Sequence, residues 1–292
     1  MSANYQRRRG DREEGRLLRS ISGFDKFMYY VMPTRNDALN YFSSSVEVTN
    51  ADNWLRSKRL EGFKGIGMLH IFIASYIRVV SKYPALNRFV IGHRIYARND
   101  IEVVMLVKQS LELDSPEEPI KVHFSPAETI YDVYNKVNDA ILEIKSAENT
   151  GTEDFADVLK KLPRPIMKLA VNFLRFCDYF GWCRKSWLDV SPFHGSIIFT
   201  DLGSLGIDPV YHHIYNFGTL SIFLAFGHKK RKYELNRKGE IIQKKYINFR
   251  VTLDDRVTDG FYCASAFRYW QQLLLHPELL EVPPEIVNED IE

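Results

Sequence analysis

The sequence has few cysteines, no long apolar run and almost no excess of charge. Its 292 residues include only Cys177, Cys183 and Cys263. Because their number is odd and their spacing fits no metal site, we expect a reducing, cytoplasmic location. No apolar run reaches the ~20 residues of a membrane-spanning helix. The arginine-rich start also lacks the apolar segment of a signal peptide.

The net charge of +2 argues against nucleic acid as a partner. Phosphate binding normally needs a clustered basic face, which this balance does not indicate. The 45% hydrophobic and 13% aromatic content is enough for one large core. We therefore expect a flexible basic tail at 1–20, one domain at 21–282 and a mobile acidic tail at 283–292.

Helical and strand patterns are mixed along the chain. The strongest helix signal is 67–83, whose broad apolar face ends before Pro84. Gly92-His93 is a two-residue turn between two short strand patterns. Further helices are expected at 126–147, with Ser125 as its N-cap, and at 262–275. Strands are expected at 46–49, 89–91, 94–97, 101–107, 120–124, 220–226 and 246–251. This mixture predicts an α/β fold.

An excursion at 148–190 separates the two halves of this pattern. It contains an apolar helix at 165–180, with Ile166, Leu169 and Phe173 on one side and Lys168 and Arg175 on the other. A buried or subunit-interface helix is favoured over one lying on a membrane surface, because the polar stripe is narrow. A monomer would have difficulty covering this apolar face, which favours an oligomer.

The stretch from Thr252 to Phe261, Thr-Leu-Asp-Asp-Arg-Val-Thr-Asp-Gly-Phe, lies between a strand and a helix. Arg256 and Asp259 are spaced to pair across a tight turn and so to orient Asp255. Gly260 then lets the chain enter the helix. From spacing alone, a purely structural turn and a functional site both remain open.

This stretch resembles the His-Arg-x-x-Asp-Gly signature of the dihydrolipoyl acyltransferases of 2-oxoacid dehydrogenase complexes and, more distantly, of chloramphenicol acetyltransferase. Asp255 stands at the histidine position, and Arg256 and Asp259 stand at scaffold positions. The resemblance implies a two-layer α/β sandwich with a mixed sheet and a homotrimer. It also implies coenzyme A or an acyl-CoA as substrate and a small-molecule acyl acceptor. We find no lipoyl-lysine motif in the chain.

The segment from Ser196 to Gly206 is similar to Phe-Thr-Ile-Ser-Asn-Leu-Gly of the same acyltransferases, which supplies a hydroxyl to the oxyanion of the tetrahedral intermediate. The resemblance is taken to place this hydroxyl position at Asp201, with Thr200 on the other face of the strand. In a trimer, Asp201 and Asp255 of neighbouring subunits would then face each other. Like charges at close range would raise one pKa. A divalent cation bridging the acids is a weaker alternative.

Two functions from different classes follow. The first is an acyltransferase whose base is Asp255 or a histidine from elsewhere in the chain. The second is a catalytically silent trimer that serves binding or assembly. His212 and His213, adjacent on an expected strand, are interpreted as structural because they would face opposite ways. The basic run Lys229–Lys232 is interpreted as a solvated hairpin, with contact to a CoA phosphate as the alternative.

Overall fold

The computed structural model describes residues 6–108, 117–146 and 162–292, which build a six-stranded sheet and a smaller three-stranded one. The large sheet has the order β2-β9-β8-β7-β5-β6. Its pairs β5–β7 and β7–β8 are parallel and the others are antiparallel. The strands are β2 (Leu39–Glu47), β5 (Ile101–Lys108), β6 (Glu117–Phe124), β7 (Ile197–Asp201), β8 (Ile222–Leu235) and β9 (Ile241–Asp254). The predicted α/β class with a mixed sheet is confirmed.

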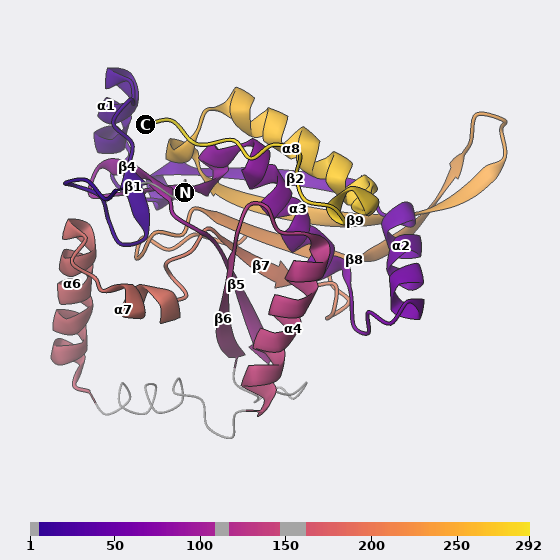
Figure 1. Ribbon diagram of the computed structural model, residues 1–292, viewed down its shortest axis with the longest axis horizontal. Helices are drawn as coiled ribbons and strands as arrows, with labels where there is room; N and C mark the ends of the chain where they lie inside the picture. The colour runs from indigo at the N-terminus through magenta and orange to yellow at the C-terminus, as the bar shows by residue number, and fades with distance from the viewer. Residues whose placement is uncertain (1–5, 109–116, 147–161) are drawn as a thin grey trace.

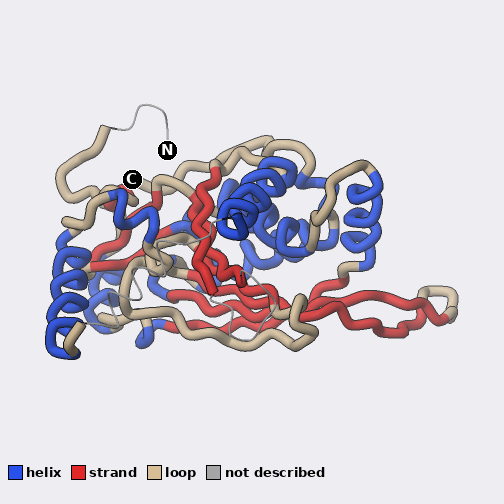
Figure 2. The backbone as a smooth tube through the Cα atoms, turned by 90° about the horizontal axis from the view of Figure 1, so that it is seen from below, coloured by secondary structure: helices blue, strands red, loops and turns tan. Residues whose placement is uncertain are grey.

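Four helices cover one face of this sheet (Figures 1 and 2). They are α2 (Thr49–Leu60), α3 (Met68–Lys82), α4 (Ile130–Ser146) and α8 (Gly260–Leu275). The helix α3 lies in the centre, and all of its residues except Leu69 and Lys82 are buried. The helix is buried on every side because it contacts the sheet on one side and other elements on the rest. The strongest helix prediction from the sequence is therefore confirmed.

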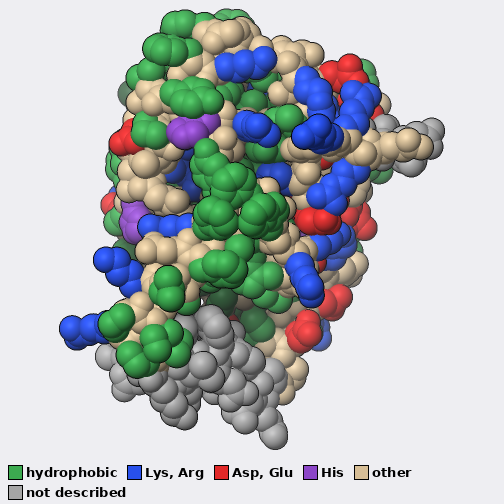
Figure 3. Space-filling model, turned by 90° about the vertical axis from the view of Figure 1, so that its left-hand side faces the viewer, with side chains coloured by type: hydrophobic (Ala, Val, Ile, Leu, Met, Phe, Trp, Pro, Cys, Tyr) green, Lys and Arg blue, Asp and Glu red, His purple; other side chains and the backbone are tan. Residues whose placement is uncertain are grey.

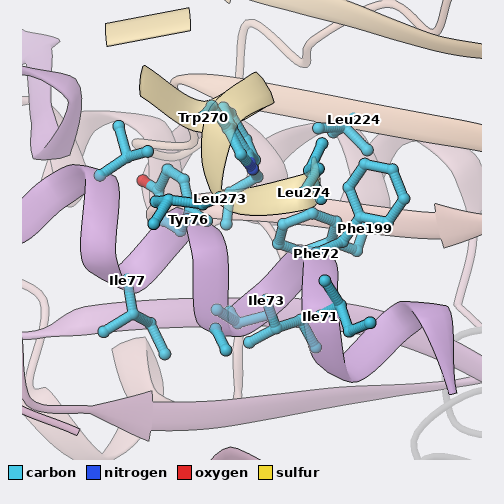
Figure 4. Close-up of a cluster of buried hydrophobic side chains, with 14 of the residues drawn as sticks. Ile71, Phe72, Ile73, Tyr76, Ile77, Phe199, Leu224, Trp270, Leu273 and Leu274 are labelled. Atoms are coloured by element: carbon cyan, nitrogen blue, oxygen red, sulfur yellow. The ribbon is translucent and has the colours of Figure 1, made fainter. Parts of the chain in front are cut away.

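Aromatic contacts hold α3 between the sheet and α8 (Figure 4). The Phe72 ring stacks on Phe226 of β8 with centroids 4.4 Å apart. The Tyr76 ring lies 5.5 Å from Trp270 of α8, whose indole nitrogen donates to the Ser75 hydroxyl over 2.7 Å. Each buried aromatic side chain contributes ~2 kcal/mol or more through the area it removes from water. This cluster joins the sheet to its helical layer.

The small sheet packs at one end of the molecule, beside three further helices (Figure 1). Its order is β1-β4-β3, and the turn between β3 and β4 has positive φ at both Gly92 (58°) and His93 (56°). Two such residues define the hairpin turn that matches the strand twist. The elements here are β1 (Gly15–Leu17), β3 (Arg88–Ile91), β4 (Arg94–Arg98), α1 (Gly23–Val31), α6 (Arg164–Phe180) and α7 (Lys185–Val190). Short 3-10 turns occur at Asn36–Ala38, Pro84–Asn87, Asp255–Val257 and Pro277–Leu280.

A two-stranded arm extends from the large sheet. The strands β8 and β9 change register between Phe226 and Lys229 and then stay paired out to Leu235 and Ile241. Figures 1 and 2 show this ribbon leaving the body of the molecule. Its Tyr233, Leu235 and Ile241 side chains are exposed.

Both chain ends differ from the expected mobile tails. In the N-terminal segment, β1 pairs with β4. At the other end, the Asn288 amide donates to the Ser81 carbonyl over 2.8 Å and Asp290 pairs with Arg88. The Ser20 amide donates to the Glu292 carbonyl over 2.7 Å, so the two segments also hold each other. The acidic tail is held because Arg88 donates to the Asp290 carboxylate and backbone hydrogen bonds join Asn288 to Ser81 and Glu292 to Ser20.

The expected start of the helix at 126 needs correction, and part of the expected excursion lies outside the residues that the structure describes. The helix α4 begins at Ile130 rather than 126, because Asp132 accepts from the Thr129 amide and hydroxyl at 2.8 and 2.6 Å and so closes its first turn there. Residues 148–161 of the predicted excursion lie outside the described residues, whereas α6 corresponds to the helix expected at 165–180. Within the described part of the chain, no helix is both long enough and apolar enough to cross a bilayer.

Candidate active site

The turn after β9 rests on a buried ion pair. The Asp254 carboxylate is fully buried and accepts from Arg256 Nε over 2.8 Å and Nη2 over 2.7 Å. The Arg35 Nε atom lies 3.4 Å from the same carboxylate. Arg256 also donates to the Met32 carbonyl over 2.9 Å. A bidentate pair of this kind fixes the backbone on both sides of Asp255.

The predicted pairing of Arg256 with Asp259 is wrong. Arg256 binds Asp254 because both side chains point into the protein, whereas Asp259 is exposed. Asp259 instead caps α8, and its Oδ1 atom accepts from the Tyr262 amide over 2.9 Å. Arg256 and Asp259 thus both stabilise the turn, but each does so through a different partner.

Asp255 is exposed at the start of this 3-10 turn, and one of its oxygens accepts from the Asn40 amide. Partial burial raises the pKa of the carboxyl, and the neighbouring Asp254 charge raises it further, while the Asn40 hydrogen bond opposes both. A carboxylate with a raised pKa is a better proton acceptor than an ordinary surface aspartate.

At the end of β7, Asp201 and Thr200 differ in what they bind. The Asp201 Oδ1 atom accepts from the Ser204 amide over 3.0 Å and so closes the turn through Leu202-Gly203. Burial raises the Asp201 pKa, and hydrogen bonds from the turn oppose the rise. The Thr200 hydroxyl makes no hydrogen bond within the described residues. Thr200 stands two residues before Leu202, as the serine does before the leucine of the acyltransferase segment quoted above.

A single chain does not bring these groups together. Ala225 of β8 pairs with Thr200 on one side and with Arg250 of β9 on the other. Arg250 precedes Asp254 by four residues, which is about 13 Å along a strand. Asp255 and Thr200 therefore lie toward opposite ends of the sheet.

Polar groups lie on the sheet face opposite α3, a placement that the sequence does not predict. His212 and His213 lie in a loop rather than on the expected strand. The His212 ring stacks on Phe223 at 4.3 Å, and its carbonyl accepts from the Thr252 hydroxyl. Burial lowers the His212 pKa, so its imidazole is neutral at pH 7. The Arg250 guanidinium lies over Tyr211 at 5.4 Å. Strand alternation at 246–251 could have placed Arg250 on this face, but no pattern predicts a loop crossing it.

A serine, a histidine and an aspartate also meet in a buried network. The Ser191 hydroxyl lies 2.8 Å from His194 Nδ1, and His194 Nε2 lies 3.1 Å from Asp178 of α6. The other Asp178 oxygen accepts from Arg12 over 2.6 Å. All four side chains are buried. We interpret the network as the anchor of α6, because a nucleophile needs access to substrate.

Two clusters of charged side chains, one around Glu102 and one in the β8–β9 arm, already form ion pairs with neighbouring residues. Glu102, His123 and Asp189 place ligand atoms within 4.8 Å of one another, but Arg98 and Lys121 lie 3.4 and 4.0 Å from Glu102. These cations disfavour a metal ion there. In the basic run Lys229–Lys232 of the arm, Lys229 pairs with Asp52 and Lys230 with Asp208. Two of its four basic side chains therefore form ion pairs within the protein.

A cavity of about 200 Å³ lies beside the Asp254–Arg256 pair. It opens between α6 and the β3–β4 turn. Its lining includes Arg35, His93, Arg175, Asp178, Tyr179 and Arg256.

Comparison with known proteins gives a likeness of structure alone. The sequence matches no family model and no curated protein. A probable dihydrolipoamide acetyltransferase from Listeria monocytogenes aligns over 91% of this chain and 94% of its own, with 14% identity and a TM-score of 0.55. A dihydrolipoamide acetyltransferase from Azotobacter vinelandii, studied for the catalytic roles of a serine, a histidine and an asparagine, aligns over 93% and 95%, with 12% identity and a TM-score of 0.57.

A chloramphenicol acetyltransferase aligns over 86% of this chain and 94% of its own, with 11% identity and a TM-score of 0.52. Together with the mixed sheet and its helical layer, these likenesses show that the chain has the chloramphenicol acetyltransferase-like α/β fold of dihydrolipoamide acetyltransferase cores.

Proposed function

We propose that the protein transfers an acyl group from coenzyme A to a small thiol, hydroxyl or amine acceptor, at the interface between subunits of a homotrimer. The observation that carries the proposal is the exposed Asp255 carboxylate on its rigid support, with a raised pKa and, among the residues that the structure describes, Asn40 as its one hydrogen-bond donor. The acyltransferase fold supplies the reaction class. In this proposal Arg256 and Asp259 hold the turn that presents Asp255.

In this mechanism, Asp255 accepts the proton of the acceptor as the acceptor attacks the thioester carbon. The oxyanion of the tetrahedral intermediate accepts a hydrogen bond from the Thr200 hydroxyl of a neighbouring subunit. Collapse of the intermediate breaks the carbon–sulfur bond. The departing CoA thiolate then takes the proton back from Asp255, which leaves acylated acceptor and CoA thiol.

Thr200 replaces Asp201 as the proposed hydrogen-bond donor. The Asp201 carboxylate accepts from the Ser204 amide of its own turn, whereas the Thr200 hydroxyl has no hydrogen bond to any residue that the structure describes. Removing a donor to an oxyanion costs about 100- to 1,000-fold in kcat. Asp201 then shapes the loop that presents Thr200.

The test is CoA thiol release from a panel of acyl-CoAs and acceptors. We expect Asp255→Asn to lower kcat about 100-fold or more and Thr200→Val to have a similar effect. Thr200→Ser is the matched control and should keep most of the activity. If the wild type turns over and both variants keep its rate, these residues do not carry the chemistry.

Mixing the two inactive variants tests the shared site. In a trimer assembled at random from Asp255→Asn and Thr200→Val subunits, about a quarter of the interfaces combine an intact Asp255 with an intact Thr200. We therefore expect up to about a quarter of wild-type activity to return after subunit exchange. No recovery from a mixture shown to contain mixed trimers would place both residues outside a shared site.

The second candidate function is a catalytically silent trimer that binds or assembles partners. It is favoured by the structural use of both acids, since Asp255 accepts from Asn40 and Asp201 closes its own turn. For a silent trimer we expect no thiol release with any acyl-CoA, while light scattering still shows a trimer. A monomer at micromolar concentration would contradict both functions.

A further inference from the structure

The helix α6 turns its apolar stripe outward and a polar side toward the body of the molecule. The stripe consists of the exposed residues Ile166, Leu169, Phe173, Phe176 and Phe180. Figure 3 shows hydrophobic side chains gathered on this side of the molecule. The expectation that α6 is buried within the chain is therefore wrong. The opposite side of the helix carries Arg175 and Asp178, and both line the cavity beside the Asp254–Arg256 pair.

Hydrogen bonds from two arginines fix the walls of this cavity. Arg35 is buried and donates to the carbonyls of two walls, that of Val90 in β3 over 3.2 Å and that of Gly218 over 2.8 Å. Arg256 donates to the Met32 carbonyl over 2.9 Å, next to a third wall at residues 33–35. The fourth wall, α6, is anchored by the buried serine, histidine and aspartate network described above. The cavity is therefore preformed rather than opened by a ligand.

One positive charge of the cavity is left without a counter-charge. The arginines and acids of the walls, together with the arginines and acids that pair with them, are Arg12, Arg35, Arg175, Arg256, Glu14, Asp178 and Asp254. Three of the four arginines pair with the three acids. The fourth is Arg175, whose guanidinium makes no hydrogen bond or ion pair with any residue that the structure describes. The surplus charge therefore lies on a side chain that can bind an anion.

Apolar groups and one neutral donor complete the lining. The apolar groups come from Val90, Ile91, Tyr179 and Phe217. The Asn216 Oδ1 atom accepts from the Asn36 amide over 2.9 Å, so the side-chain nitrogen of Asn216 remains as a second donor. The cavity volume is about 200 Å³. An engineered protein cavity of ~150 Å³ holds benzene, so a benzene-sized ring with one small substituent fits here.

We propose that this cavity binds a small organic carboxylate with an apolar body, and that the carboxylate pairs with Arg175. A planar guanidinium binds a carboxylate through two parallel hydrogen bonds, and the apolar walls surround the rest of the molecule. The single surplus charge balances a monoanion. A phosphate group carries ~1.5–2 negative charges at pH 7 and would leave part of its charge uncompensated in the cavity. The site does not depend on the acyl transfer proposed at Asp255.

The experiment measures calorimetric titration and thermal melting of the full chain with benzoate, 2-methylpropanoate, benzamide and inorganic phosphate. We expect benzoate to bind with a dissociation constant of about 1 mM or lower and to raise the melting temperature as its concentration rises. Benzamide has the same shape without the charge, so it should bind at least about tenfold more weakly. Inorganic phosphate should bind more weakly than either carboxylate.

Variants of α6 locate the site. Arg175→Gln should weaken benzoate binding about tenfold or more, because it removes the charged donor. Arg175→Lys should keep the preference for benzoate over benzamide, although with lower affinity, because the charge remains and the planar fork is lost. Tyr179→Ala should weaken benzoate binding several-fold through lost apolar contact. Arg164→Gln is the matched control, since Arg164 is an exposed arginine of α6 that does not line the cavity, and it should bind like the wild type.

Three results would overturn the proposal. The first is no binding of either carboxylate at about ten times the expected dissociation constant. The second is equal affinity for benzoate and benzamide, or tighter binding of phosphate than of both carboxylates. The third is unchanged benzoate binding in Arg175→Gln, or an equal loss in Arg164→Gln. Because Arg164, Arg175 and Tyr179 are exposed, the variants without ligand should melt at the wild-type temperature, which is measured before each titration.

Discussion

The two helices α3 and α6 have similar lengths and similar apolar content but opposite environments. In α3 every residue except Leu69 and Lys82 is buried, whereas in α6 only Asp178 is buried. The helix α3 is buried on all sides, and its side chains meet the sheet and α8. The helix α6 has one apolar stripe, and that stripe faces outward. Hydrophobic residues indicate that a helix needs a partner, but they do not indicate whether the partner is in the same chain.

The largest expected effect separates the two helices by stability. Phe72→Ala in α3 should lower the free energy of unfolding by about 3–5 kcal/mol, because it leaves a cavity against Phe226. Phe173→Ala in α6 should change it by less than about 0.5 kcal/mol, because the ring is exposed. Urea denaturation of both variants measures the difference. Equal losses would mean that α6 is part of the folded core.

The next effect concerns the attachment of α6. Asp178→Ala removes the acid that Arg12 and His194 share; because Arg12 keeps its buried pair with Glu14, we expect a cost of roughly 1–3 kcal/mol. We also expect amide hydrogens of α6 to exchange faster while those of α3 stay protected. Mass spectrometry of exchanged fragments reports both helices in one sample. Unchanged exchange in α6 would show that other contacts hold it.

The smallest effect is a dependence of stability on pH that originates in α3. Burial lowers the pKa of His70 to about 4, below its usual ~6.5. The unfolded chain then binds a proton between pH 6.5 and 4 that the folded protein does not, so folding stability should fall as the pH drops through this range, by up to about 3 kcal/mol. His70→Asn should flatten the profile. If this variant lost stability with pH as steeply as the wild type, another group would be responsible.

Much of the scaffold could be predicted from sequence, because strong local patterns and packing agree there. The helix 67–83, the Gly92-His93 turn and the strands at 101–107 and 120–124 correspond to observed elements. Side-chain pairing at the turn could not be predicted. Arg256 is three residues from Asp259 and two from Asp254, and spacing does not say which acid is buried.

The same limit applies to long-range placement. The separation of Asp255 from Thr200 depends on strand order, which the sequence does not specify. The position of His212 depends on a loop that crosses the sheet face. The outward direction of the α6 stripe depends on the buried Asp178 anchor, which joins residues far apart in the chain.

The β8–β9 arm has a consequence for how the chain would respond to cleavage. Its tip, with Arg237 and Lys238 beside Gly239, is exposed and far from the core. A trypsin-like protease would therefore be expected to nick the chain there before it reaches the body. The two fragments would stay associated, because β8 and β9 remain paired with each other and with β7 and β2 throughout the large sheet. The cut protein would behave as a complex of two complementary pieces, separable only by denaturation.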